Sequence, residues 1–138
     1  LRSIGVTIIL AGLIWLIQPD QFFYLPVHRP ILWMVIMVLY PVLSALPQEF
    51  IYRTYFFHRF DHLMTLKYAT VITSAIAFSF LHIVFHNWVA IGLSFGAGLL
   101  FGITYMRTES LFWVTVEHAI YGCLVFTMGL GNFFYRGF

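Results

Sequence analysis

The sequence predicts an all-α protein, a polytopic bundle of transmembrane helices with about five spans in this fragment. Of the 138 residues, 62% are hydrophobic and only 9% are charged, whereas soluble domains have roughly 25% charged residues. The mean hydropathy is +0.92. The apolar residues form continuous runs instead of alternating with polar ones, which favours helices over a barrel. Residues 1–138 are therefore expected to form a single membrane-embedded domain.

The first hydrophobic segment covers about 4–17 and is short for a span. Because the chain begins with Leu1 and not with methionine, we expect a fragment or a processed form with a truncated first span. The second segment covers about 31–57, the last part with a polar face. Pro41 and Pro47 lie within it, and each removes a backbone donor, so we expect a kink or a new helical start there.

Three further hydrophobic segments follow, at about 68–85, 89–106 and 111–130. His86 and Asn87 are expected to form a tight turn between the first two of them. The middle segment contains four glycines with small-xxx-small spacing, which are expected to let helix backbones approach closely in lipid. These glycines are Gly92, Gly96, Gly98 and Gly102.

The charge balance excludes nucleic acid as a partner. The formal net charge is only +2, and no cluster of Lys and Arg accompanies it. The partner that the composition does predict is the lipid bilayer. We expect an integral, multi-pass protein of a prokaryotic cell membrane.

Ionisable residues inside apolar segments are costly beside hydrocarbon, so they usually face a bundle interior or a wet cavity. Glu49 and Arg53 are four residues apart, which puts both side chains on one face of a helix. His82 lies in a later segment, and the pair Glu117 and His118 lies in the last one. We predict that Glu49, Arg53, His82 and His118 converge in one buried reaction centre.

Each of these residues also has a plainer interpretation. Glu49 could be a general base, a metal ligand or half of a structural ion pair with Arg53. His82 could be a hydrogen-bonded core residue, or could pair with His86 four residues on, although His86 falls at the expected helix end. Glu117 and its neighbour diverge around the helix, so only one of them can face the cavity and the other needs a separate partner.

Three short motifs in order resemble the CPBP family of CAAX prenyl proteases and bacteriocin-processing enzymes, also called the Abi family. That family has the motifs Glu-Glu-x-x-x-Arg, Phe-x-x-x-His and His-x-x-x-Asn. Here they correspond to residues 48–53, 78–82 and 118–122, and the glycine-rich stretch 95–102 also resembles the family. The resemblance covers about 31–130.

The resemblance implies an intramembrane endopeptidase that cleaves membrane-associated or prenylated CAAX-type substrates. In the family's mechanism a glutamate and the first histidine activate a water, and the last histidine and an asparagine stabilise the oxyanion. Two positions depart from the motifs: Gln48 replaces the first glutamate, and Gly122 replaces the asparagine. Either Glu49 takes over the base role, or the chain is an altered or inactive member.

The sequence is compatible with more than one cofactor and more than one class of function. No cofactor is certain, but Glu49, His82 and His118 could supply three ligands to a divalent metal such as zinc and leave a position for water. A peptide or protein at the membrane is the expected substrate. The first alternative function is a non-catalytic membrane binding, immunity or scaffolding member of the same family. The second is a haem-binding bundle with His82 and His118 as axial ligands, or an ion-translocating bundle in which a Glu-His-Arg set relays protons.

Overall fold

A computed structural model describes residues 2–66 and 68–134, and the regular structure within these ranges is entirely helical. This confirms the all-α prediction. The α-helices are α1 (Arg2–Ile17), α2 (Tyr24–His28), α3 (Pro30–Tyr40), α4 (Leu46–Glu49), α5 (Phe56–Phe60), α6 (Ala69–Leu81), α7 (Trp88–Thr108) and α8 (Leu111–Met128). Short 3-10 or π-helical pieces join them: η1 (Pro19–Gln21), η2 (Pro41–Ala45), η3 (Phe50–Tyr55), η4 (Asp61–Leu63), η5 (His82–Phe85) and η6 (Leu130–Phe134).

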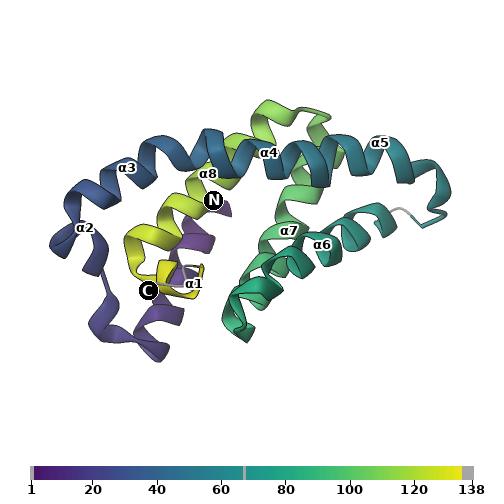
Figure 1. The fold of residues 1–138 in the computed structure, drawn as a ribbon. Helices are drawn as coiled ribbons and strands as arrows, with labels where there is room; N and C mark the ends of the chain where they lie inside the picture. Colours follow the sequence, from purple (N-terminus) through teal and green to yellow (C-terminus); the bar gives the residue numbers. More distant parts are fainter. Residues whose placement is uncertain (1, 67, 135–138) are drawn as a thin grey trace.

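The longest feature is one uninterrupted helical run, Pro30–Leu63, that contains α3, α4 and α5. It crosses the upper part of the view in Figure 1, with α6 and most of α7 and α8 below it. Pro41 and Pro47 do not interrupt the run. It contains π-helical turns at Pro41–Ala45 and Phe50–Tyr55. Such turns are wider than α-turns and often occur at functional sites.

The wider turns keep one side of this run directed at the rest of the protein. Four buried residues follow one another at intervals of four, namely Ala45, Glu49, Arg53 and Phe57. In a regular α-helix a stripe with this spacing would drift by about 40° per step, because a turn holds only about 3.6 residues. The π-helical turns offset that drift, so the stripe stays facing the core.

Five apolar helices occupy the five predicted hydrophobic segments. Three of them are long and apolar enough to cross a membrane: Pro30–Leu63, Trp88–Thr108 and Leu111–Met128. The other two, Arg2–Ile17 and Ala69–Phe85, are shorter. An integral membrane bundle therefore fits the structure, while the number of spans and the prokaryotic origin stay predictions.

Helices α6 and α7 pack closely, and two of the predicted glycines allow it. A Cβ on Gly98 would lie 3.0 Å from Cα of Ala75, and a Cβ on Gly102 would lie 2.9 Å from Cγ1 of Val71. The packing role was wrong for the other two glycines. A Cβ on Gly92 or Gly96 would meet nothing within 4 Å, and both residues line a cavity instead.

The predicted turn between the third and fourth segments is present. His86 takes the left-handed backbone conformation, with φ 54°, and ends η5. The Asn87 side chain then accepts a hydrogen bond of 2.7 Å from the backbone N–H of Ala90, which caps the start of α7. His86 is exposed on this turn, so it does not join the buried His82 as a ligand pair.

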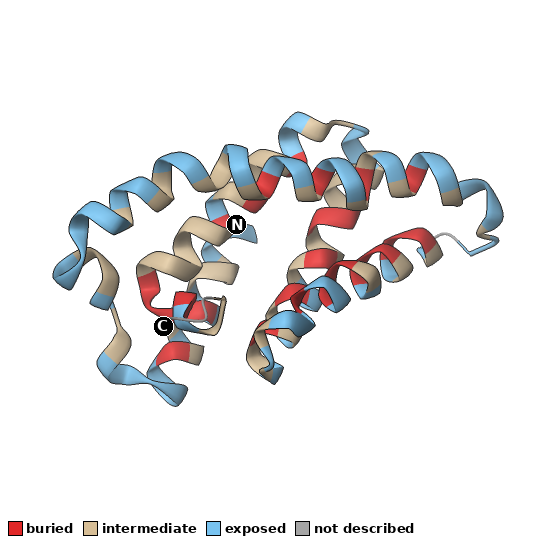
Figure 2. Ribbon diagram, in the orientation of Figure 1, coloured by how far each residue is buried: buried red, intermediate tan, exposed pale blue. Residues whose placement is uncertain are grey.

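The buried residues lie on the inner faces of the helices, whereas much of the long run is exposed (Figure 2). One cluster of buried apolar residues joins α1 to the end of α8, and a second joins α6, α7 and α8. The second cluster consists of Phe78, Phe101, Val114 and Tyr121. Two of its aromatic rings form the walls of the polar centre described next.

Candidate active site

Glu49 and Arg53 form a fully buried ion pair. Arg53 Nε lies 3.1 Å from Glu49 Oε2, and both side chains are 0% exposed. Glu49 ends α4, and Arg53 lies one turn later in the π-helical η3. The predicted convergence of these two residues on one helix face is confirmed.

Arg53 is surrounded by polar and aromatic groups from two other helices. Its Nη1 donates to the Ser74 hydroxyl at 3.2 Å, and its Nη2 donates to the Gly98 carbonyl oxygen at 3.5 Å. The guanidinium carbon lies 4.9 Å from the ring centre of Phe78 and 5.6 Å from that of Phe101. These contacts fix the guanidinium, which in turn fixes the carboxylate of Glu49.

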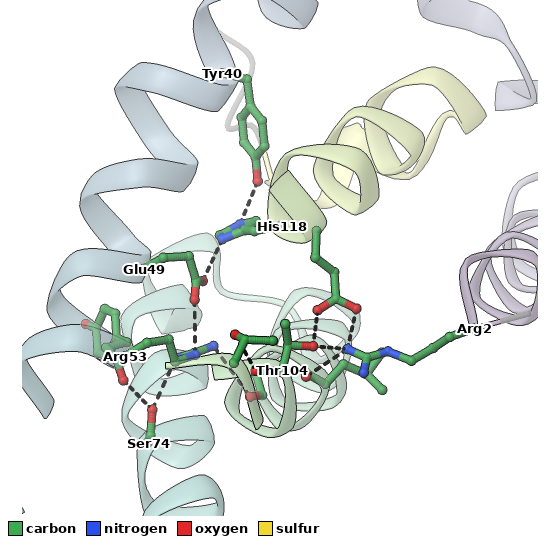
Figure 3. A network of polar contacts seen from close by, with 12 residues as sticks. Arg2, Tyr40, Glu49, Arg53, Ser74, Thr104 and His118 are labelled. Atoms are coloured by element: carbon green, nitrogen blue, oxygen red, sulfur yellow. Dashed lines mark hydrogen bonds and ion pairs between the residues drawn. The ribbon is translucent and has the colours of Figure 1, made fainter. Parts of the chain in front are cut away.

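His118 is bonded to the same carboxylate from the opposite end of the sequence. Its Nδ1–H donates to Glu49 Oε1 at 2.7 Å, and its ring stacks on Phe101 with 4.6 Å between ring centres. Because a carboxylate can only accept, Nδ1 carries a proton, and in the neutral form of the ring Nε2 is then an acceptor. Figure 3 shows Glu49 between Arg53 and His118.

Tyr40 completes this line of contacts, and the sequence analysis did not single it out. Its hydroxyl lies 2.9 Å from His118 Nε2 and is the donor in that hydrogen bond (Figure 3). A signal was present in the sequence, because Tyr40, Ser44 and Gln48 recur every four residues and share a helix face. All three line the cavity.

His82 lies near these groups but is not bonded to Glu49 or His118. Its Nδ1–H donates to the Phe78 carbonyl oxygen at 2.9 Å, and its ring centre is 4.8 Å from that of Phe78. The same Phe78 ring meets His118 edge-on at 5.6 Å. His82 Nε2 has no hydrogen-bond partner within the described ranges, so this nitrogen is available as an acceptor.

An apolar cavity of about 460 Å³, partly open to the outside, lies between the helices. His82 and His118 line it, together with residues of α1, α7 and α8, whereas Glu49 and Arg53 do not. The prediction that all four residues face one cavity is therefore half right: two face it, and the ion pair lies behind His118. Gln48 also lines the cavity, and its buried Oε1 has no hydrogen-bond partner among the described residues.

The geometry does not assemble the metal ligands expected from the sequence. Among residues 2–66 and 68–134, no three His, Cys, Asp or Glu side chains gather as a metal-binding group. Both carboxylate oxygens of Glu49 are engaged by Arg53 and His118, and both ring nitrogens of His118 have protein partners. The set of Glu49, His82 and His118 does not fit a zinc ion in this arrangement.

Glu117 points away from the cavity and has its own partners, as the divergence from His118 predicted. It pairs with Arg2 of α1, and its Oε2 accepts from the Thr104 hydroxyl at 2.6 Å. Arg2 also donates to the Leu100 carbonyl oxygen at 2.8 Å. This network ties α1 to α7 and α8 and is separate from the ion pair of Glu49 (Figure 3).

Gly122 leaves room for the Tyr40 ring. A Cβ at this position would collide with the ring and with its hydroxyl oxygen. We expect Gly122→Ala to lower the free energy of unfolding by about 1–3 kcal/mol through overpacking. Gly12→Ala is the matched control, because a Cβ there meets nothing within 4 Å. Denaturant titration in detergent measures both, and equal stability of the two variants would contradict the close contact.

The sequence of this chain matches one known protein family over most of its length. Residues 30–124 match the family described as "Type II CAAX prenyl endopeptidase Rce1-like". The chain belongs to this family. The suspected relationship to the CAAX proteases is thereby confirmed, and the matched region contains the Glu49–Arg53 pair, His82 and His118. The comparisons with curated proteins and with solved structures gave no match.

Membership in the Rce1-like family indicates the general activity of this chain, that of a membrane endopeptidase. The Rce1-like family is one of membrane proteases, and the apolar helices of this chain agree with an integral membrane protein. Tyr40 and the rings of Phe78 and Phe101 contact His118 or Arg53 and so belong to the candidate site.

Proposed function

We propose that this chain is an intramembrane endopeptidase that hydrolyses a peptide bond of a membrane-associated substrate, of which a prenylated CAAX-type peptide is one kind. The observation that carries the proposal is the pair of buried histidines, His82 and His118, on the wall of an apolar cavity of about 460 Å³. Such a cavity suits an apolar or lipidated segment, and imidazoles suit proton transfer.

His82 is the proposed general base. Its Nδ1–H is held by the Phe78 carbonyl oxygen, so Nε2 of the neutral ring can accept a proton. In the first step Nε2 takes a proton from water while the water oxygen bonds to the carbonyl carbon. The C–N bond then breaks, and the leaving amine takes the proton back from His82.

Glu49 is assigned a positioning role instead of the base role expected from the sequence. Its carboxylate is 0% exposed and does not line the cavity, so it does not meet a water there. It holds Nδ1–H of His118 and thereby fixes the ring at the cavity wall. The guanidinium of Arg53 pairs with the carboxylate, which offsets the free-energy cost of burying its charge away from water.

The proposal is tested by peptide cleavage in liposomes with a fluorogenic membrane peptide, with and without a lipid chain. We expect His82→Ala to lower kcat by at least about 10²-fold, the lower bound typical of a lost general base. His118→Ala is expected to have an effect of the same order. His58→Ala is the control, because His58 is exposed on α5.

Three outcomes would contradict the proposal. Folded wild-type protein that cleaves no peptide would favour the non-catalytic alternative, which the amide of Gln48 in the cavity wall supports. Unchanged cleavage by both histidine variants would move the reaction away from this cavity. Loss of cleavage in the presence of a chelator would contradict the metal-free step and would favour the zinc expectation.

A further inference from the structure

Among the described residues, Tyr40 is the only one whose hydroxyl is hydrogen-bonded to His118. Its oxygen lies 2.9 Å from Nε2, and its ring meets His118 edge-on at 5.9 Å and Phe126 edge-on at 5.6 Å. These ring contacts support the aromatic side chain from two sides, and Tyr40 lines the cavity. The hydroxyl hydrogen can still rotate about the C–O bond.

Gly122 is the second half of this arrangement. It lies one turn after His118 on α8, so a side chain there would share the space beside the imidazole. The Tyr40 ring already fills that space, because a Cβ on Gly122 would collide with it. A side chain from the long helical run thus occupies the place that a side chain from α8 would otherwise take.

In its neutral form, His118 has no proton left to donate into the cavity. The single proton of its neutral ring is on Nδ1 and points at Glu49. Nε2 is an acceptor and receives the Tyr40 hydroxyl proton. The Tyr40 O–H is therefore the donor on this part of the wall, beside His118, and His82 lines the same cavity.

We propose that Tyr40 is a catalytic residue whose hydroxyl donates a hydrogen bond to the oxyanion. This inference rests on the proposed peptidase function. As water adds to the carbonyl, the O–H turns from His118 Nε2 to the carbonyl oxygen, where negative charge develops. A hydrogen bond to an oxyanion is stronger than one to a neutral imidazole, so the exchange favours the transition state. No bond in Tyr40 breaks, and the O–H returns to His118 when the intermediate collapses.

Tyr40→Phe is the decisive variant, because it removes the hydroxyl and keeps the ring above Gly122. We expect kcat for the membrane peptide to fall by about 10²–10³-fold, as for the loss of one oxyanion donor. KM should stay within about twofold, because the bond forms only in the transition state. Tyr55→Phe is the control: it lies on the same helical run, 56% exposed, and should leave both constants unchanged.

A second measurement does not depend on activity. In full-length protein with ¹⁵N-labelled histidine in micelles, the Nε2 resonance of His118 should shift in Tyr40→Phe and stay in place in Tyr55→Phe. A His118 Nε2 resonance with the same chemical shift in Tyr40→Phe as in wild type would overturn the inference.

The kinetic result separates this inference from the function on which it rests. Suppose that wild-type protein cleaves the peptide, that His82→Ala does not, and that Tyr40→Phe keeps kcat within about threefold of wild type. A threefold change corresponds to less than about 1 kcal/mol, because each tenfold change in rate is about 1.36 kcal/mol. This result would show that Tyr40 is not the donor, while the peptidase function would stand. Wild-type protein without cleavage would instead contradict the function itself.

Discussion

Glu49→Gln is expected to abolish most peptide cleavage, with a fall in kcat of about 10³-fold or more. The amide keeps the size of the side chain but loses the charge that lies between Arg53 and His118. His118 then loses the partner that fixes its proton on Nδ1, and comparable tautomer errors cost about 10⁴-fold in a serine protease triad. Kinetics in liposomes measure the effect.

The same substitution is expected to lower stability by about 3–5 kcal/mol, because Arg53 would remain buried and charged without its partner. Glu117→Gln is the matched control. Glu117 also pairs with an arginine, but its side chain is 14% exposed and that of Arg2 is 37% exposed. We expect it to cost no more than about 1 kcal/mol and to leave kcat unchanged. Equal effects of the two variants would contradict a special role for Glu49.

Arg53→Met is expected to lower the free energy of unfolding by as much as Glu49→Gln, again about 3–5 kcal/mol, because it leaves the Glu49 charge buried and unpaired. It also removes the guanidinium from the contacts with Ser74 and Gly98. Arg59→Met, on the exposed face of α5, should stay within about 0.5 kcal/mol of wild type. Denaturant titration in detergent gives both values.

A double variant separates the charge from the packing. Glu49→Leu/Arg53→Met removes both charges, and apolar replacement of a buried pair is often neutral or even stabilising. It should therefore be more stable than Arg53→Met, although inactive. A double variant as unstable as Arg53→Met would show that lost packing, and not the stranded carboxylate, causes the damage.

The sequence was sufficient to predict the ion pair and the helical class, for clear physical reasons. Charged groups four residues apart in an apolar run need each other and need burial, which is what Glu49 and Arg53 have. The continuous apolar runs predicted the five apolar helices because helices satisfy their own backbone groups. Both inferences depend only on residues close in sequence.

The sequence could not assign the role of Tyr40 or place Glu49 behind the cavity wall. The chain has 16 Phe and 8 Tyr residues, so an aromatic residue in an apolar run carries no mark of its partner. Which oxygen of Glu49 meets which helix depends on how α8 packs against the long run. The π-helical turns are equally invisible, because prolines in a membrane helix are compatible with a kink, a restart or a wider turn.

The length of the run Pro30–Leu63 has a consequence for the depth of the site in a bilayer. With 34 residues it measures about 50 Å, whereas the hydrocarbon core is about 30 Å thick. Glu49 lies about 30 Å along the run from Pro30. If Pro30 marks one border of the hydrocarbon and the run stands upright, the ion pair lies at the other border, and tilting draws it deeper. In the upright orientation, a water molecule would reach the histidines across a short distance from one surface, and the proposed cleavage would take place beside the headgroups and not at the bilayer centre.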